Sequence, residues 1–180
     1  MKKLLLLPLT TIALTVCGQS PKKVLKKLGN DPIFFVDSVN IDKSELKNYD
    51  PKDIAQVTVY KDSDAIRLAG PEGKDGVVYV ETKEFARKLY WTFFSSKSAE
   101  YSRIVPTPGS DSLIQYILNK RVLTSNFEGD LALVSDSIFK KITILDRDAL
   151  QSQYHISDKT YGVVIESDKP ANLYHAKKKF

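Results

Sequence analysis

The sequence is poor in the residues that carry most thiol and metal chemistry. Its 180 residues include one cysteine, Cys17, and two histidines, His155 and His175. A single cysteine excludes an internal disulfide, so the apolar core must stabilise the fold. No cluster of histidine, cysteine and carboxylate residues has the spacing of a metal site. We therefore expect no bound metal and no catalysis by a thiol.

Motifs that are typical of enzymes are absent as well. The glycines at 70, 73 and 76 could suggest a phosphate loop, but no Gly-Lys-Ser/Thr follows them and the predicted helix precedes them. Asp62-Ser63-Asp64 lacks the glycine and the terminal glutamate of a calcium loop. Neither a nucleophile elbow nor paired catalytic acids stand out. We expect a non-enzymatic protein with no cofactor and no catalytic residue.

Long apolar runs are confined to the N-terminus. Met1-Lys2-Lys3 is basic, and residues 4–16 form an apolar stretch that is too short for a comfortable membrane span. Residues 1–18 are thus predicted to be a signal peptide. We expect export, to the periplasm or to the periplasmic face of the outer membrane.

Cys17 lies at the end of this apolar stretch, and two processing routes fit it. Leu14-Thr15-Val16-Cys17 resembles a bacterial lipobox, although Val16 is bulkier than the usual residue before the cysteine. In that route Cys17 is a lipid-attachment residue and anchors the protein to a membrane. In the other route Val16-Cys17-Gly18 is a signal-peptidase site and Gln19 is the new terminus. Both routes stay open.

The net charge of +5 is mild, and acids and bases are interspersed through the body of the chain. Basic residues gather at the two ends, in a linker at 19–30 and in a tail at 169–180. Solvated tails are the simpler interpretation of such runs. We expect no nucleic acid partner.

Residues 55–82 predict a strand, a short helix, a glycine turn and a second strand. Val57 and Val59 alternate with polar residues, as in a half-buried strand. Asp62 or Ser63 is expected to cap a helix whose apolar face carries Ala65, Ile66, Leu68 and Ala69. Gly70 suits the position after the helix end, and Gly73 and Gly76 are expected to bracket a tight turn. Residues 77–80 form a buried strand.

The preceding segment adds further elements. Residues 33–36 predict a first strand and Asp37-Ser38 a turn, while Asp42 and Glu45 form a capping box. Together, residues 32–83 resemble the plug domain of TonB-dependent outer-membrane receptors in the SusC-like branch found in Bacteroidetes. Pro32 to Asp37 resembles the motif P-hydrophobic-hydrophobic-V-D-G. Leu46, Pro51, Asp53 and Ile54 resemble L-x-x-x-x-P-x-D-I. The long motif that follows is matched at Val57, Val59, Lys61, Asp62, Ser63, Ala65, Gly70, Gly73, Gly76, Val77, Thr82 and Lys83.

This resemblance implies a plug fold and an envelope setting, but Ser38 replaces the usual turn glycine and Ala69 the usual tyrosine. The rest of the chain is too short for a receptor barrel. We therefore expect a stand-alone, barrel-less module, similar to the accessory domains of envelope and sensor proteins.

The second half is predicted to be a degenerate copy of the first, at about 114–166. Residues 114–118 resemble the first strand, and 141–146 resemble 56–61. The separation is 85 positions from Val57 to Ile142 and 86 from Gly76 to Gly162. Two nearly equal separations indicate duplication. Gly162 is accordingly expected to be a structural turn residue like Gly70, Gly73 and Gly76.

An aromatic cluster lies between the two halves. Phe85, Ala86, Leu89, Tyr90 and Phe93 suit one face of a helix, and Trp91 and Phe94 fall off it, although a strand over 89–94 fits too. The cluster has two interpretations, namely core packing and an interaction surface. The residues concerned are Tyr90, Trp91, Phe93 and Phe94.

The fold class we predict is α+β, with two tandem plug-like units of small mixed sheet and short helices, which could share one core. After the signal peptide and the basic linker, the predicted order is unit 1 at 31–94, a connector at 95–111, unit 2 at 112–168 and the basic tail. The favoured function is a non-enzymatic envelope module that binds an envelope protein, with glycan or peptidoglycan as other ligands, and strand addition at a sheet edge is a suitable route. The alternatives are an envelope hydrolase built around His155 and a purely structural lipoprotein.

Overall fold

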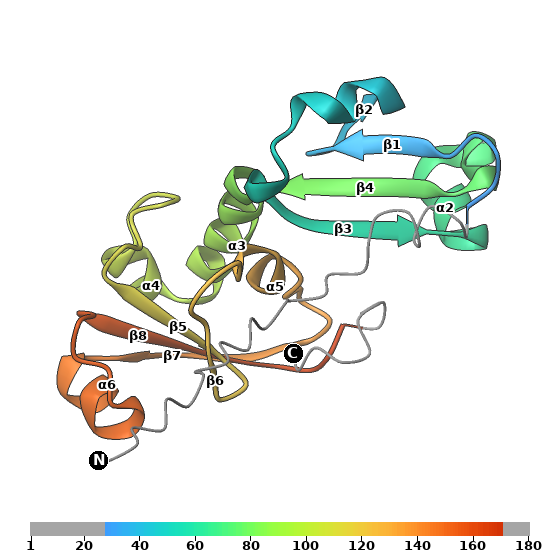
Figure 1. Cartoon of the computed structure of the whole chain (residues 1–180). Coiled ribbons are helices and arrows are strands. Elements are labelled where there is room, and N and C mark those ends of the chain that lie inside the picture. Colours follow the sequence, from blue (N-terminus) through green and yellow to red (C-terminus); the bar gives the residue numbers. More distant parts are fainter. Residues whose placement is uncertain (1–27, 171–180) are drawn as a thin grey trace, which may run out of the picture.

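The structure, a computed structural model, describes residues 28–170 and confirms the predicted α+β class. The described chain forms two four-stranded mixed sheets with several short helices (Figure 1). The predicted signal peptide, Cys17, most of the basic linker, His175 and the end of the basic tail lie outside the described residues.

The first unit consists of β1 to β4, and its sheet has the strand order β2-β1-β4-β3. β1 is parallel to β4, and the other two pairings are antiparallel. Its elements are β1 (Ile33–Val36), β2 (Val39–Ile41), η1 (Lys43–Asn48), η2 (Pro51–Asp53), β3 (Ile54–Tyr60), α2 (Asp62–Ala69), η3 (Gly70–Asp75) and β4 (Val77–Thr82).

The second unit runs from α3 to β8, and its strand order, β6-β5-β8-β7, reproduces that of the first. β5 is parallel to β8, and β6 and β7 are antiparallel to their neighbours. Its elements are α3 (Lys83–Lys97), α4 (Ala99–Ile104), β5 (Ile114–Leu118), β6 (Arg121–Val122), α5 (Glu128–Ala132), β7 (Phe139–Leu145), α6 (Arg147–Tyr154) and β8 (Tyr161–Ser167).

The two units match residue for residue over their last two strands. Ile54 pairs with Thr82 and Phe139 with Ser167, so the counterparts are 85 positions apart, and both ladders have an irregular step just after this pair. The helices α2 and α6 keep the same separation. A shared β-bulge is a specific backbone feature, so it strengthens the interpretation of two tandem copies.

A turn contact that the sequence did not reveal also recurs. Asp37 and Asn119 each open a two-residue hairpin turn with positive φ, of 50° and 49°. The Asp37 carboxylate accepts a hydrogen bond from the Thr82 backbone N–H at 2.8 Å, and the Asn119 side chain accepts one from the Ser167 N–H at 2.9 Å. Aspartate and asparagine tolerate this left-handed conformation. The turn of each hairpin is thereby tied to the end of the last strand of its unit.

Gly162 is a correction to the sequence analysis, because it lies within β8 and not in a turn. It pairs with Leu145, as Val77 pairs with Tyr60, so the counterpart of Gly76 is Tyr161. A Cβ at Gly162 would lie 2.9 Å from the Cδ1 of Leu150. The glycine therefore makes room for a helix side chain, and its backbone needs no turn.

The other three glycines lie around η3 and serve different purposes. Gly70 ends α2 with a φ of 68°, and Gly76 follows η3 with a φ of 97°, values that favour glycine. Gly73 is buried inside η3, where a Cβ would lie 2.3 Å from the carbonyl oxygen of Ala65. In the second unit His155 takes the place of Gly70, with a φ of 59°.

Helix α2 also differs from the prediction. Its N-cap residue is Lys61, which makes no side-chain capping bond, and Asp62 is the first helical residue. Only Ala65 is buried, while Ile66 and Leu68 are exposed. Ala69 is half-buried, so Ile66 and Leu68 are the part of the predicted apolar face that remains in solvent.

Helix α3 buries a narrower face than the sequence suggested. Its buried residues are Ala86, Tyr90 and Phe94, each one helical turn from the next, whereas Leu89 is exposed. The predicted boundary between residues 94 and 95 falls inside this continuous helix. Tyr90 and Phe94 pack with the second sheet, so α3 belongs to the second unit.

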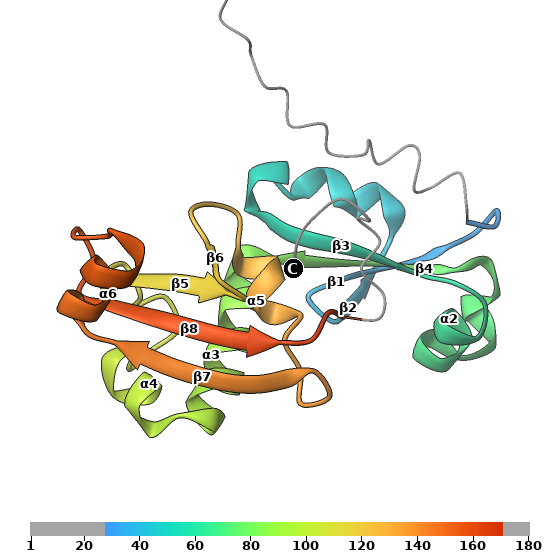
Figure 2. The ribbon, with the colours of Figure 1, turned by 90° about the horizontal axis from the view of Figure 1, so that it is seen from below.

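Each unit has its own core, contrary to the suggestion of a shared one. The second unit buries residues of α3, α4, β5 and β8 in one large cluster. The cluster of the first unit consists of Phe34, Val36, Val78 and Val80, packed against partly buried side chains such as Leu46 and Tyr49. Figure 2 shows the two sheets side by side.

Helices α3 and α5 lie between the two sheets (Figure 1). Arg87 of α3 pairs with the buried Glu128 of α5 at 3.0 Å. Gly129 of α5 packs directly on β3, because a Cβ there would lie 2.8 Å from the carbonyl oxygen of Ala55. Helix α5 thus fills the junction and touches the first part of β3.

Candidate interaction surface

The first unit exposes apolar side chains at positions where the second unit does not. Val39, Val57, Ile66 and Leu68 are exposed by 62, 52, 47 and 44%. Their counterparts, read from the paired strands and helices, are Arg121, Ile142, Gln151 and Gln153. Two of these are exposed glutamines, and Arg121 and Ile142 are half-buried. At these four positions the exposed apolar groups are therefore a property of the first unit and not of the fold, although the second unit exposes Leu89 and Leu113 elsewhere.

The backbone of β3 faces outward at Val57 and Val59. The backbone N–H of Ile33 in β1 donates to the carbonyl oxygen of Gly76 at 3.0 Å. The N–H of Asp37, in the turn after β1, donates to the carbonyl oxygen of Val80, also at 3.0 Å. The N–H and C=O groups of successive residues point to opposite sides of a strand, so those of Val80 point toward β1 and those of Tyr79 point toward β3. Thr58, opposite Tyr79, bonds to β4, whereas Val57, opposite Val80, points away from the sheet. We call the outward side of Val57 to Tyr60 the β3 edge.

The outward side of β3 is accessible at Val57 and Val59 but is covered by α5 at the start of the strand. Among the described residues, neither Val57 nor Val59 has a backbone partner on its outward side. At the start of the strand, Gly129 of α5 lies against Ala55 and Gln56. An edge with unpaired N–H and C=O groups can accept another strand.

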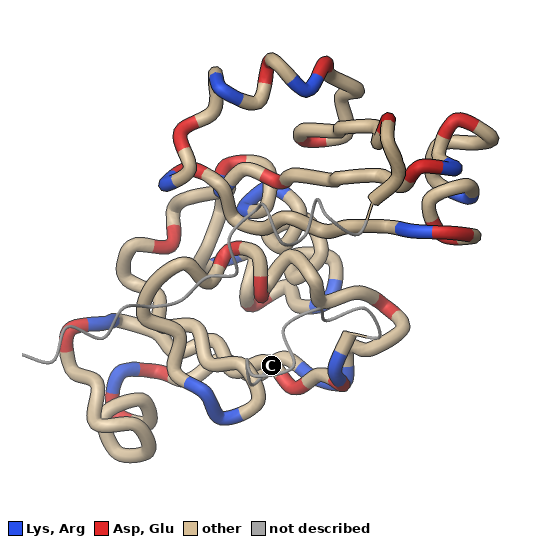
Figure 3. Tube along the Cα trace, turned by 45° about the vertical axis from the view of Figure 1, so that its right-hand side comes forward, with Lys and Arg blue, Asp and Glu red and all other residues tan. Residues whose placement is uncertain are grey.

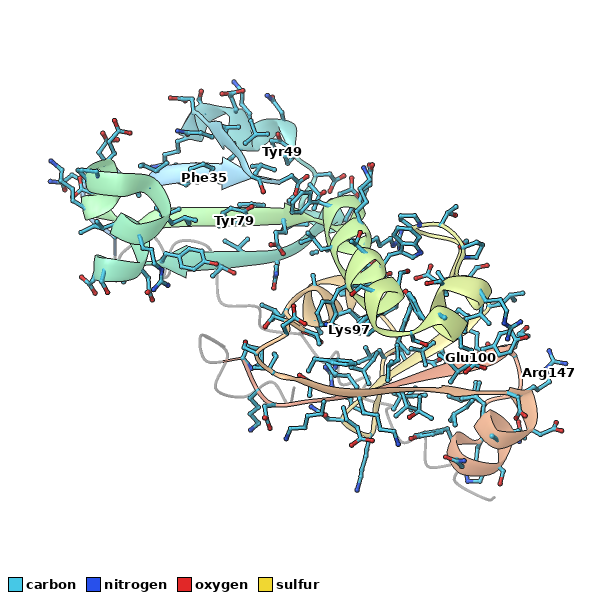
Figure 4. The ribbon with its side chains drawn as sticks, turned by 180° about the vertical axis from the view of Figure 1, so that it is seen from behind. Phe35, Tyr49, Tyr79, Lys97, Glu100 and Arg147 are labelled. Atoms are coloured by element: carbon cyan, nitrogen blue, oxygen red, sulfur yellow. The ribbon has the colours of Figure 1, made fainter. Side chains whose placement is uncertain are left out.

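One face of the first sheet carries an aromatic pair. Phe35 and Tyr79, on the neighbouring strands β1 and β4, stack with centroids 5.9 Å apart, and Ser38 shares a hydrogen bond with the Tyr79 hydroxyl (Figure 4). Their counterparts in the second unit are the aliphatic residues Ile117 and Val164. Aromatic side chains at these positions are thus specific to the first unit, and both are half-buried.

The aromatic cluster predicted from sequence belongs to the core. Tyr90 and Phe94 are buried, and Trp91 and Phe93 pack against the same cluster. The Trp91 indole donates to the carbonyl oxygen of Val105 at 2.8 Å. Phe93 makes an edge-to-face contact with Phe139 at 5.4 Å. These contacts favour core packing for the cluster.

Three tyrosines of that core form a hydrogen-bond network with Asp111. The hydroxyls of Tyr90 and Tyr116 donate to the Asp111 carboxylate at 2.8 and 3.1 Å, and Tyr101 bonds to Tyr116 at 3.0 Å. Burial raises the pKa of all three hydroxyls, and the Asp111 charge raises the pKa of Tyr90 further. Neutral, buried hydroxyls of this kind stabilise the fold and have no access to a substrate.

A hollow of about 600 Å³ lies beside β1, β2 and η3. Its polar lining carries acids and the bases Lys43 and Lys74, and the Asp75 carboxylate accepts from the Asp31 N–H at 3.1 Å. Within residues 28–170, no group of three or more His, Cys, Asp or Glu side chains could hold a metal ion. The mixed charge of the lining selects no ligand class.

His155, the residue that an envelope hydrolase would need in a pocket, is exposed at the end of α6. Its backbone N–H donates to the carbonyl oxygen of Gln151 at 3.0 Å, which closes the helix. It does not line the hollow beside β1, β2 and η3. Its left-handed backbone gives it a structural role at a helix end.

Comparison with known proteins adds no assignment. No family model matches the sequence, and no match was found among curated proteins or solved structures. The resemblance to receptor plugs therefore stays a prediction. No helix between residues 28 and 170 is long and apolar enough to cross a membrane.

Proposed function

We propose that this chain is a non-enzymatic binding module of the cell envelope, in which the first unit binds an envelope protein and the second unit is its scaffold. The observation that carries the proposal is the difference between matched surfaces. Ile66 and Leu68 are exposed on α2, where α6 has Gln151 and Gln153. Exposed apolar side chains that a matched copy of the same fold replaces by polar ones are candidates for a contact with a partner.

The second unit acts as an internal reference for this argument. It has the same strand order and the same bulge, with polar or half-buried residues at the corresponding positions. The fold therefore does not require apolar groups there. Because the exposure of an apolar side chain to water is unfavourable, a binding role explains its presence on the first unit.

The envelope setting rests on the sequence. The basic start and the apolar stretch that follows predict export, and Cys17 offers a lipid anchor if it is modified. The resemblance of residues 32–83 to receptor plugs supports the same compartment. We therefore propose that the partner is a protein of the envelope, and we propose no nucleic acid and no cofactor.

Site-specific photo-crosslinking in cells tests this proposal with a matched control. A photoreactive amino acid at Ile66 is expected to give a discrete adduct with an envelope protein, whereas the same amino acid at Gln151 gives much less. Both side chains are exposed at equivalent positions of α2 and α6. Equal yields at the two positions, or no adduct at either Ile66 or Leu68, would rule out the first unit as the binding part.

A further inference from the structure

We infer that the β3 edge receives a short, extended, uncharged segment of the partner protein as an added strand. This inference rests on the proposed function and names the site and the partner class. The β3 edge presents the outward N–H and C=O groups of Val57 and Val59. The complement of such a ladder is another extended main chain, and a helix or a small molecule would leave it unsatisfied.

Helix α5 limits the length of the added segment. Gly129 lies against Ala55, so a new strand cannot continue past Val57 toward the start of β3. The accessible stretch is Val57 to Tyr60, which suits a short linear peptide. Pairing with β3 of a second copy about Val57 would place a strand against Ala55, where α5 already lies. That register is therefore excluded for a second copy, whereas a short peptide segment fits the accessible stretch without bringing a second α5 to the edge.

The side chains of β3 define the chemistry of the occupant. The strand Ile54–Tyr60 carries no charge, and Val57 is exposed beside the edge. Figure 3 shows β3 as a run without charged positions that is followed by charged ones. The next two residues are the basic Lys61 and the acidic Asp62. An occupant that places a small apolar residue next to Val57 would cover it, and an uncharged segment would avoid leaving a charge without a partner.

The corresponding strand in the second unit has charged side chains at the counterparts of Ala55 and Gln56, directly before Ile142. There β7 carries the exposed Lys140 and Lys141, and Lys140 pairs with Asp168 across the end of the sheet. Charged side chains, lysine above all, discourage strand addition at an edge. β7 has the same outward backbone pattern at Ile142 and Ile144, so it provides a matched control within the same molecule.

A proline substitution can block the outward side of β3 without disturbing the pairing of β3 with β4. Val57→Pro removes an N–H that points away from β4, so the ladder with β4 stays intact, and proline is tolerated at such edge positions. We expect this change to lower the yield of the Ile66 photo-crosslink by about tenfold, since an added strand loses one to two hydrogen bonds and meets the ring. Ile142→Pro makes the same change in β7 and should leave the yield unchanged. Val57→Lys repeats the test without altering the backbone.

A peptide titration followed by NMR tests the recognition chemistry directly. The probe is acetyl-Thr-Val-Thr-Val-Thr-amide, and its control is the same peptide N-methylated at all five residues, which removes the backbone donors from both edges. The unmodified peptide should shift the amide signals of Val57 and Val59, and leave Ile142 and Ile144 in place. The N-methylated peptide should shift none of them.

Several outcomes would overturn the inference. Equal shifts from both peptides, shifts in β7 and not β3, or no shift at all would each exclude main-chain pairing at the β3 edge. Shifts of Val57 and Val59 that depend on protein concentration without peptide would identify a second copy as the occupant. If the Ile66 crosslink forms but survives Val57→Pro and Val57→Lys, the inference fails and the proposed function stands. If no crosslink forms on the first unit, the proposed function fails.

Discussion

Replacement of Gly73 by alanine is expected to lower the free energy of unfolding by about 3 kcal/mol, the cost of forcing an extra methyl group into a packed site. The new Cβ would lie 2.3 Å from the carbonyl oxygen and 2.7 Å from the carbonyl carbon of Ala65, and 3.2 Å from the nitrogen of Ile66. All three atoms belong to the backbone of α2, so no side chain can rotate away. Helix α2 would have to leave the end of the first sheet.

Gly70→Ala provides the matched comparison. No atom lies within 4 Å of the Cβ that would be added there, but the residue has a φ of 68°. Only the backbone conformation, with a φ of 68° and a ψ of −158°, opposes the change, which costs about 2 kcal/mol. Urea unfolding followed by circular dichroism measures both variants. A Gly73→Ala protein no less stable than Gly70→Ala would contradict the close contact between η3 and α2.

Raising the pH above 10 is expected to destabilise the protein steeply, by about 4 kcal/mol per pH unit once three buried tyrosines contribute. Burial raises the pKa of Tyr90, Tyr101 and Tyr116 above their ordinary value of 10.0. The unfolded chain therefore releases these protons near pH 10, while the folded protein keeps them. The stabilisation is complete below pH 10 and is lost as the pH rises toward the folded pKa values.

Tyr116→Phe tests this explanation, because it removes one titrating hydroxyl and leaves the ring in the core. The dependence of the unfolding free energy on pH between 10 and 12 should become less steep by about one third. Denaturant unfolding at fixed pH values measures the slope for both proteins. An unchanged slope in the variant, or a flat profile in the parent, would show that Tyr116 ionises as freely in the folded protein as in the unfolded chain.

Local patterns were sufficient to predict much of the fold. The strands at 33–36 and 114–118 and the capping box of Asp42 and Glu45 were placed correctly, because alternation and capping depend on a few neighbouring residues. The two tandem units were also visible as a repeated spacing of 85 positions. Each of these signals is contained in a short stretch of chain.

The errors arose where a residue type was taken as a proxy for backbone conformation. Gly162 was matched to Gly76 with a slip of one position, because glycine was assumed to mark the turn. In the structure His155 occupies the position that corresponds to Gly70, but Gly70 has φ 68° and ψ −158° whereas His155 has φ 59° and ψ 33°, and Gly162 gives space to Leu150. The left-handed helical conformation of His155 is one that histidine tolerates, so α6 ends without a glycine by using a different turn from that of α2.

The face of α3 and the β3 edge depend on contacts that are distant in sequence. Leu89 suits an apolar stripe, yet Phe94 is buried because α3 packs on the second sheet and not on the first. The sequence indicates that a partner strand could add to a sheet edge, but it does not indicate which strand forms that edge. The identity of the strand is a property of the three-dimensional structure. It follows from the approach of Gly129 to Ala55 and from the orientation of Val57 in the ladder. Neither is encoded in a local pattern.

Amide hydrogen exchange on the free protein tests most directly whether the β3 edge is available for a partner. The outward N–H groups of Val57 and Val59 should exchange at rates close to those of an unfolded chain, while those of Thr58 and Tyr60, which face β4, should be strongly protected. Ile142 and Ile144 should behave like Val57 and Val59. Protection of Val57 and Val59 equal to that of Thr58 would mean that another part of the chain already pairs with this edge, and would contradict the account.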